Sequence, residues 1–128
     1  MTDITTLSDR ELLELAAKFC GIPGEYFGWE VTGEIGIWDQ EIDGNLWNPL
    51  QDAGDRARAC DEHMISIIHE TRLKRVYVVV SEDIIGFEVF EDYSDHKNRT
   101  TAANYAATRL MAMMQLAKEK KNVHKSTA

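Results

Sequence analysis

Cysteine and proline are scarce in this chain, with two of each among 128 residues. Cys20 and Cys60 stand apart, since neither belongs to a C-x-x-C pair and no cysteine–histidine cluster has the spacing of a zinc site. We therefore interpret them as two buried free thiols of a protein in a reducing compartment. The fold must then rest on its own apolar core, for which 44% hydrophobic residues are sufficient.

Long apolar runs and basic residues are also lacking. No apolar run approaches the ~20 residues of a membrane span, and the N-terminal segment has no cationic stretch of a signal peptide. With 14 Lys and Arg against 22 Asp and Glu, the formal net charge is −8. Binding to nucleic acid requires neutralising phosphates, so we expect no general nucleic-acid binding. We also expect no membrane association and a cytoplasmic location.

Recognised catalytic motifs are missing as well. The sequence contains no G-x-S-x-G, P-loop, G-x-G-x-x-G or H-E-x-x-H motif. No two histidines stand four residues apart, the spacing of a helical metal pair. His96 follows Asp95, which places two acid–base residue types together, but adjacency in sequence does not set their geometry. We predict no catalytic residue and no cofactor.

One acidic stretch is similar in part to a calcium-binding loop. Asp39, Glu41, Asp43 and Gly44 match early positions of an EF-hand loop. Leu50 stands at the twelfth position, where the loop requires a bidentate glutamate. We therefore predict a solvated acidic turn and no metal site.

The segments that remain have clear helical or strand patterns. Ser8 to Glu11 form a capping box, and apolar spacing predicts a first helix that ends before Gly21. The other predicted elements are an aromatic loop at 23–33, a strand at 34–40, turns at 43–49, a helix at about 51–64, strands at 65–70, 75–80 and 84–91, a polar loop at 92–99 and a helix at about 101–121.

This order, α-β-α-β-β-β-α, predicts an α+β fold with a small antiparallel sheet of about four strands flanked by three helices. We expect one domain over 1–128, with a flexible lead at 1–7 and a flexible tail at 122–128. Residues 76–80 are apolar on both faces, which predicts a central strand covered on both sides. Gly54 and Ala57 predict that the second helix lies close to the sheet.

Cations, hydroxyls, an amide and an aromatic ring gather where the last helix begins, in HKNRTTAANY (96–105). Free amides and the helix dipole favour anions there. The candidate ligand-binding residues are Lys97, Arg99, Thr101, Asn104, Tyr105 and Arg109. The alternative is an ordinary capped helix start with solvated charges.

Three methionines lie close together in the last helix. We expect Met114 in the core, and Met111 either in the core or at a subunit interface. Together with exposed aromatic residues, this cluster predicts a homo-oligomer, a dimer or higher.

The segment LWNPLQDAGDRARAC (46–60) resembles the phage ABA sandwich domain family, small proteins of phages and prophages. The resemblance rests on Trp47-Asn48-Pro49, on the acidic helix start with Asp52, Gly54 and Asp55, and on the Ala-rich segment NRTTAANYAATRLMAM (98–113). It covers about 44–118 and implies a phage or prophage origin and a sheet flanked by helices. For a phage-encoded protein, the expected location is the cytoplasm of the host cell. It implies little chemistry.

A looser resemblance, of architecture alone, is to the Thoeris anti-defence one family, which sequesters a cyclic ADP-ribose-type signal without cleaving it. Three hypotheses follow. The first is a non-catalytic phage protein that binds a cyclic nucleotide or ADP-ribose-type molecule at a subunit interface. The second is an acidic phage protein that binds and modulates a host protein. The third is a small hydrolase.

Overall fold

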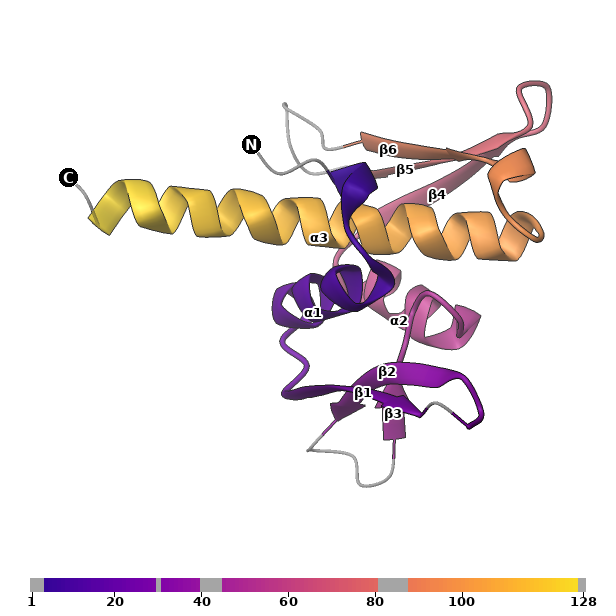
Figure 1. Cartoon of the computed structure of the whole chain (residues 1–128). Helices are drawn as coiled ribbons and strands as arrows, with labels where there is room; N and C mark the ends of the chain where they lie inside the picture. The colour runs from indigo at the N-terminus through magenta and orange to yellow at the C-terminus, as the bar shows by residue number, and fades with distance from the viewer. Residues whose placement is uncertain (1–3, 30, 40–44, 81–87, 127–128) are drawn as a thin grey trace.

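The computed structural model describes residues 4–29, 31–39, 45–80 and 88–126 (Figure 1). The strands form two antiparallel three-stranded sheets, β1-β2-β3 and β4-β5-β6. The elements in chain order are η1 (Ile4–Thr6), α1 (Asp9–Cys20), β1 (Gly24–Trp29), β2 (Glu34–Asp39), β3 (Asn45–Trp47), α2 (Ala53–Glu62), β4 (Ile65–Glu70), β5 (Arg75–Val80), β6 (Glu88–Asp92), η2 (Tyr93–Asp95) and α3 (Arg99–Ser126). The predicted α+β class is confirmed.

The prediction of one four-stranded sheet is wrong, because β1 lies in the segment predicted as a loop and β3 in the segment predicted as turns, and both pair with β2 in a separate sheet. The loop prediction for 23–33 rests on its glycines, which are typical of turns, and on its aromatic residues, which are typical of core anchors. Gly24 has φ 158°, and a Cβ atom at this position would lie 1.9 Å from the Trp38 carbonyl oxygen. The glycine therefore permits close pairing of β1 with β2. Glycine is more typical of turns, but at this position it belongs to a strand.

The layers also differ from the expected sheet flanked by helices. Figure 1 shows the two sheets at opposite sides of the molecule, with the helices between them. α3 packs against β4-β5-β6, and α1 packs between α3 and the other sheet. Each sheet therefore buries one face only. β5 is central, as predicted, and Val76 and Val78 are buried on its inner face. No described helix covers its outer face, so the prediction that both sides are covered is wrong.

α1 begins and ends where the sequence predicts. The Ser8 hydroxyl accepts a hydrogen bond from the Glu11 amide at 3.2 Å, and Glu11 Oε1 accepts one from the Ser8 amide at 3.1 Å. Gly21 then adopts the left-handed conformation, φ 69°, in which glycine closes a helix without steric cost. The capping box and the helix end are both confirmed.

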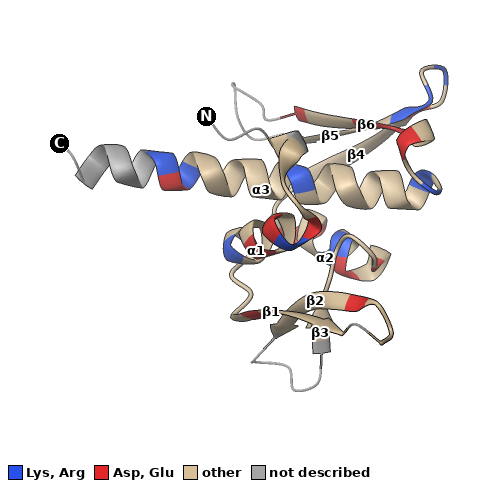
Figure 2. Cartoon of the chain, in the orientation of Figure 1, with Lys and Arg blue, Asp and Glu red and all other residues tan. Residues whose placement is uncertain are grey.

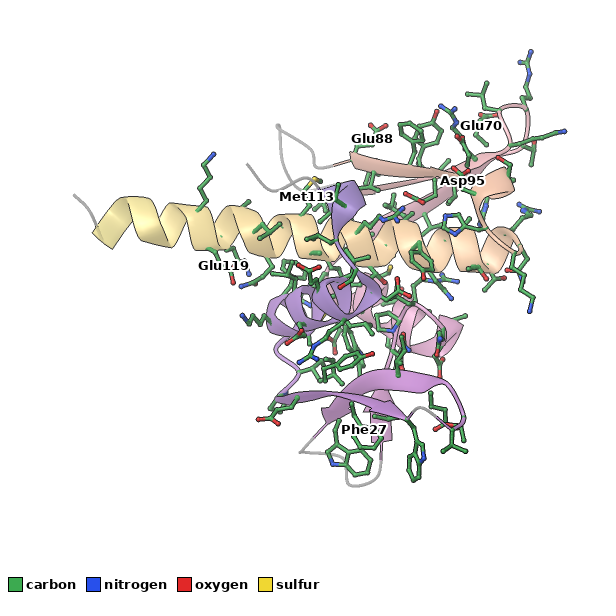
Figure 3. All side chains as sticks on the ribbon, viewed as in Figure 1. Phe27, Glu70, Glu88, Asp95, Met113 and Glu119 are labelled. Atoms are coloured by element: carbon green, nitrogen blue, oxygen red, sulfur yellow. The ribbon has the colours of Figure 1, made fainter. Side chains whose placement is uncertain are left out.

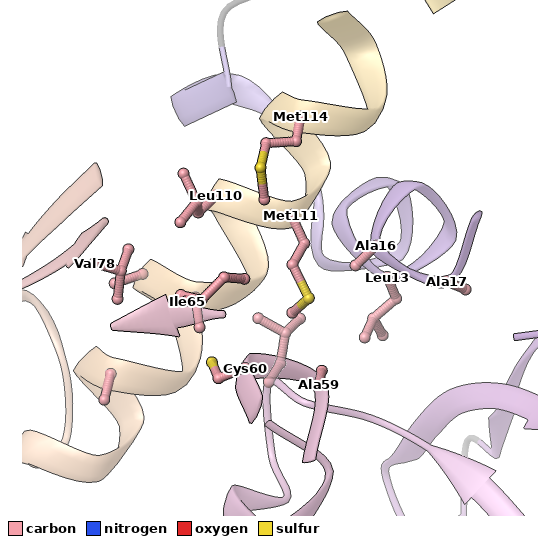
Figure 4. Packing of buried hydrophobic residues seen from close by; sticks show 14 of the residues in the cluster. Leu13, Ala16, Ala17, Ala59, Cys60, Ile65, Val78, Leu110, Met111 and Met114 are labelled. Atoms are coloured by element: carbon pink, nitrogen blue, oxygen red, sulfur yellow. The ribbon is translucent and has the colours of Figure 1, made fainter. Parts of the chain in front are cut away.

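α3 is the central element of the core. Its four alanines between positions 102 and 107 are 0–1% exposed, and their small side chains allow neighbouring elements to approach the helix closely. Leu110, Met111 and Met114 continue this buried surface toward α1 and β4-β5-β6 (Figure 4). The sequence left open whether Met111 lies in the core or at a subunit interface. Met111 is fully buried within the chain, so it is a core residue.

Secondary structure extends further toward both ends of the chain than the predicted elements do. η1 lies within the predicted lead, and α3 continues to Ser126, well into the predicted tail. η2 and the start of α3 likewise replace much of the polar loop predicted at 92–99. Among the described helices, none combines the length and hydropathy that crossing a membrane requires.

Truncating the centre of this core is expected to be costly. Leu110→Ala should lower the free energy of unfolding by about 2–5 kcal/mol, because it removes buried methyl groups and leaves a cavity. Leu73→Ala, at an exposed position between β4 and β5, is the matched control and should change stability by at most about 0.5 kcal/mol. Urea unfolding of both variants measures the difference, and equal losses would contradict the described packing.

Candidate functional site

The Trp-Asn-Pro segment is a structural joint between the sheet β1-β2-β3 and α2. Trp47 is buried. The Asn48 side chain donates to the Ile35 carbonyl at 2.6 Å and accepts from the Leu50 amide at 2.9 Å. These bonds close the turn after β3, which confirms Trp47 as a core residue and Asn48-Pro49 as a turn.

The acidic start of α2 completes this joint. Asp52 caps the helix by accepting hydrogen bonds from the Gly54 and Asp55 amides. The buried Asp55 carboxylate accepts from the Asn48 amide at 2.9 Å and from Arg58 at 2.6 Å. The predicted role of Gly54 and Ala57 is wrong, because the atoms nearest to a Cβ at Gly54 belong to Asp52 and Arg58 of the same segment, and Ala57 is exposed.

The six candidate ligand residues do not form one site. Lys97 and Arg99 lie exposed where α3 begins. Thr101 takes part in the helix cap, since its amide and hydroxyl both donate to Asn98 Oδ1. Asn104 is buried and faces α2, where its amide donates to the Leu50 carbonyl at 3.1 Å. Tyr105 and Arg109, four residues apart on another side of α3, enter a separate cluster.

That cluster, here called the buried ionic cluster, consists of Asp9, Glu91, His96, Tyr105 and Arg109. Glu91 Oε1 accepts from His96 Nε2 at 2.7 Å and also forms an ion pair with Arg109. The three side chains are only 10%, 8% and 18% exposed. His96 is therefore a buried partner of Glu91 and not a free residue of a polar loop. The cluster joins β6 to α3, and its polar atoms are largely satisfied by one another.

Tyr105 extends this cluster to α1. Its hydroxyl donates to the Asp9 carboxylate at 2.9 Å, and its ring lies 5.0 Å from the His96 ring and 5.3 Å from the Arg109 guanidinium. Burial, followed by the hydrogen bond and the charge of Asp9, raises the pKa of Tyr105 to about 12.

A raised pKa makes the neutral phenol the form that stabilises the fold. The contribution of Tyr105 is complete below the ordinary tyrosine pKa of about 10. It is lost as the pH rises through the folded pKa of about 12. We therefore expect Tyr105→Phe to lessen the loss of stability above pH ~10. Ultraviolet titration of phenolate in the wild type and the variant, with unfolding curves at each pH, measures both effects. Identical alkaline profiles would contradict this role.

A second group, here called the basic cluster, lies where α3 begins and consists of Arg56, His69, Tyr93 and Arg99. His69 Nδ1 lies 2.6 Å from the Tyr93 hydroxyl, and the Arg99 guanidinium is 5.5 Å from the centre of the Tyr93 ring. Arg56 Nε donates to Asn104 Oδ1 at 3.0 Å. Burial lowers the pKa of His69, and the charges of Arg99 and Arg56 lower it further, so both guanidinium groups act on one imidazole.

The arginines of the basic cluster differ from most others in the chain in their partners. Arg10, Arg58, Arg75 and Arg109 each have a carboxylate within ion-pair distance. Within the described part of the chain, Arg56 and Arg99 have no such partner. Figure 2 shows the basic residues where α3 begins. Two unneutralised guanidinium groups around a histidine and a tyrosine can bind a phosphate or carboxylate through charge-assisted hydrogen bonds.

Sequence reasoning identified only part of this arrangement. Arg99 and Lys97 are adjacent to the helix start in the sequence, but Arg56, His69 and Tyr93 come from other elements. Asn104 was predicted as a ligand contact, yet its side chain holds Arg56 in place. No spacing in the sequence links α2, β4 and α3, so only tertiary packing could reveal these partners.

Both cysteines are free, as predicted. Burial raises the pKa of Cys20 to about 12 and that of Cys60 to about 11. Both thiols are therefore protonated at neutral pH and are poor nucleophiles.

No group of three or more metal-ligating side chains in the described residues could hold a metal ion. Three of the four residues that match the EF-hand loop, Glu41, Asp43 and Gly44, lie outside the described residues. Comparisons with models of protein families, with curated proteins and with solved structures find no match to this chain.

Proposed function

We propose that this chain is a non-catalytic, phage- or prophage-encoded accessory protein that binds and sequesters a small nucleotide-type signal of host anti-phage defence. The observation that supports ligand binding is the pair of unneutralised arginines, Arg56 and Arg99, in a chain of net charge −8. The proposed phage origin rests on the resemblance around Trp47.

An acidic chain has many carboxylates available to pair with arginine. Arg56 and Arg99 both lower the pKa of His69 and have no carboxylate partner among the described residues, so they favour an anion from outside the chain. Asn104 orients Arg56 through its side-chain oxygen, which lowers the entropy that binding would otherwise cost. The Tyr93 ring beside Arg99 adds an aromatic surface against which a nucleobase or ribose can pack. We place the phosphate between the two guanidinium groups.

The direct test is thermal unfolding of the purified protein with a panel of ADP-ribose, cyclic ADP-ribose isomers and cyclic mono- and dinucleotides. Binding to the native state raises the unfolding temperature. Ligand released by denaturing the complex should be chemically unaltered, whereas altered ligand would support the hydrolase hypothesis. No shift with any compound would contradict the proposal.

Charge removal in the basic cluster should weaken binding selectively. Each charge-assisted hydrogen bond contributes about 1.5–3 kcal/mol, so Arg56→Gln and Arg99→Gln should each weaken binding by at least about tenfold. Lys120→Gln, an equal loss of charge on an exposed part of α3, is the control and should leave the affinity unchanged. Calorimetric titration of the three variants measures this difference. NMR titration should also show that a bound anion raises the pKa of His69.

A second candidate function is binding to a host protein or to a second copy of the chain. It is favoured by the aromatic outer face of β1-β2, where Phe27 projects away from the helices (Figure 3). Trp29 is 53% exposed, and the Phe27 ring lies 5.8 Å from Trp29 and 6.0 Å from Trp38. Exposed aromatic patches are typical of protein interfaces.

Two measurements separate the partners of this face. Light scattering after size exclusion should give the mass of a dimer or higher oligomer if a second copy binds. Phe27→Glu should then return the protein to a monomer. A monomeric wild type that recovers a host protein from lysate in a salt-sensitive manner would favour the host partner instead.

A further inference from the structure

The negative charge of this chain is concentrated in one segment of the sequence. Residues 19–55 contain eight Asp and Glu and no Lys, Arg or His, whereas the other 14 acidic residues equal the 14 Lys and Arg in number. This segment supplies the sheet β1-β2-β3, and Figure 2 shows Asp and Glu but no Lys or Arg on β1 and β2. The sheet therefore attracts a partner of positive charge.

Three aromatic side chains lie together on the outer face of this sheet, and they are here called the aromatic strip: Phe27, Trp29 and Trp38. The Phe27 ring is in the middle, 5.8 Å from the Trp29 ring and 6.0 Å from the Trp38 ring. Gly36 is the cross-strand partner of Phe27 and has no side chain, so it does not separate Phe27 from Trp38. The three side chains are 37–53% exposed, so the strip is open to a partner.

Each indole of the aromatic strip has a glutamate directly across from it in the sheet. Glu25 lies opposite Trp38. Glu34 lies opposite Trp29. Directly opposite residues of an antiparallel pair share one face, with Cβ atoms about 5 Å apart. Both glutamates are exposed, and among the described residues neither has an ion-pair partner. Each end of the strip is therefore a pair of one indole and one unneutralised carboxylate.

An indole beside a carboxylate favours an organic cation. The face of the indole attracts the cation electrostatically, and the carboxylate adds a charge-assisted hydrogen bond. Arginine suits both groups, because its guanidinium stacks on aromatic rings and its N–H groups donate to carboxylates. A second copy of the chain docked by this same face would bring like-charged glutamates together, so the charges favour a different, basic protein.

We propose that the aromatic strip binds a basic segment of another protein, with one arginine on each indole–carboxylate pair and an apolar side chain on Phe27. This inference rests on the second candidate function, in which the outer face of β1-β2 binds a protein, and it specifies the chemistry of that partner.

The distance between the two pairs defines the sequence of the segment. Glu25 and Trp29 are four positions apart on β1, so the two pairs lie about 14 Å apart along the strand. An extended segment covers this distance in four residues, and its side chains at i, i+2 and i+4 point to one side. A helix would need about nine residues, or two and a half turns, which would place the two arginines on opposite faces. The partner is therefore an extended segment with arginines at i and i+4 and an apolar residue at i+2.

The test uses the full-length protein and a fluorescein-labelled synthetic peptide with two arginines four positions apart, a leucine midway between them and threonine elsewhere. Fluorescence anisotropy should show binding that weakens as the salt concentration rises. A peptide of the same composition with its arginines five positions apart points them to opposite sides and should bind at least about threefold more weakly. No binding of the first peptide, or equal binding of the two, would overturn the proposal.

Charge removal at the two glutamates locates the bound arginines. Glu25→Gln and Glu34→Gln should each weaken binding by about threefold, the contribution of an exposed ion pair. The double variant should weaken it by about tenfold, because distant sites act independently. Glu88→Gln removes an exposed carboxylate from β6 of the other sheet and should leave the affinity unchanged. A loss in Glu88→Gln as large as in the double variant would show attraction by net charge alone and would overturn the proposal.

Two substitutions of Trp38 separate the aromatic ring from its apolar area. Trp38→Leu removes the ring and should weaken binding by about threefold, whereas Trp38→Phe keeps a ring face and should lose less. The position is 40% exposed, and circular dichroism should show both variants folded as the wild type is. Equal affinities of the wild type and Trp38→Leu would contradict the stacked arginine.

Further results distinguish failure of this inference from failure of the functions proposed above. Arg56→Gln, which should weaken nucleotide-type binding, should bind the peptide as the wild type does, because the two sites share no residue. If Phe27→Glu abolished recovery of a host protein while the peptide did not bind, the face would be a docking site but its basic partner would be refuted. A dimer that Phe27→Glu dissociates and the peptide does not would likewise overturn the inference.

Discussion

Glu91→Ala is expected to lower the free energy of unfolding by about 3–5 kcal/mol, a large effect for a single substitution. Glu91 is the carboxylate that Arg109 and His96 share, and all three side chains are at most 18% exposed. Without Glu91, the Arg109 guanidinium would stay buried with no opposite charge beside it, and Arg109 Nε already lacks a partner among the described residues. Chemical denaturation at neutral pH measures the loss.

The next residue in the strand is a matched control. Asp92 also pairs with an arginine, Arg75, at 2.9 Å, but its side chain is 38% exposed. Asp92→Ala should therefore cause a much smaller loss, since solvent screens exposed ion pairs. The double variant Glu91→Leu with Arg109→Met should recover much of the stability, because an apolar pair can replace a buried ion pair. Equal losses for Glu91→Ala and Asp92→Ala would refute the burial of this cluster.

Asp55→Ala should lower the free energy of unfolding by about 3 kcal/mol. The Asp55 carboxylate is 6% exposed and accepts a hydrogen bond from the buried backbone N–H of Asn48. Alanine would leave that amide without a partner and would separate α2 from the turn after β3. Urea unfolding measures the loss, and Asp55→Asn should lose less because its side-chain oxygen can still accept the bond.

Asp61→Ala provides the control for this second effect. Asp61 is on the same helix but is exposed, so its removal should change stability by at most about 0.5 kcal/mol. If the losses for Asp55→Ala and Asp61→Ala were equal, the hydrogen bond between α2 and the Trp-Asn-Pro turn would not contribute to stability.

Local elements of the fold were predictable because their determinants lie within a few residues of one another. The capping box of α1 needs only Ser8 and Glu11, and its end needs only Gly21. The short connection between β4 and β5 likewise dictates an antiparallel pair. In contrast, the strand β1 was missed because glycines such as Gly24 and Gly28 are typical of turns, and the close approach of the β2 backbone to Gly24 is visible only in the tertiary structure.

The candidate site divides in the same way. The cations beside the start of α3 were visible in the sequence, since Lys97 and Arg99 precede or begin an Ala-rich helical pattern. The effect of Arg56 on the pKa of His69 was not, because the two residues lie on α2 and β4 with 12 positions between them, and no local pattern links them. Likewise, nothing in the sequence indicated that Tyr105 bonds to Asp9, which lies at the start of α1.

By itself the sequence determined the α+β class, the limits of α1, the antiparallel strands of the second sheet and the free state of both cysteines. The helix limits and strand pairings depend on hydrogen bonds or spacing within a short segment, and the free cysteines follow from the lack of a C-x-x-C pair or a cysteine–histidine cluster. Only the tertiary structure decided that two sheets enclose the helices, and that Glu91, His96 and Arg109 are buried together while Arg56 and Arg99 remain unneutralised. Burial and charge pairing depend on which distant elements meet, and the packing of α3 against both halves of the chain sets those meetings.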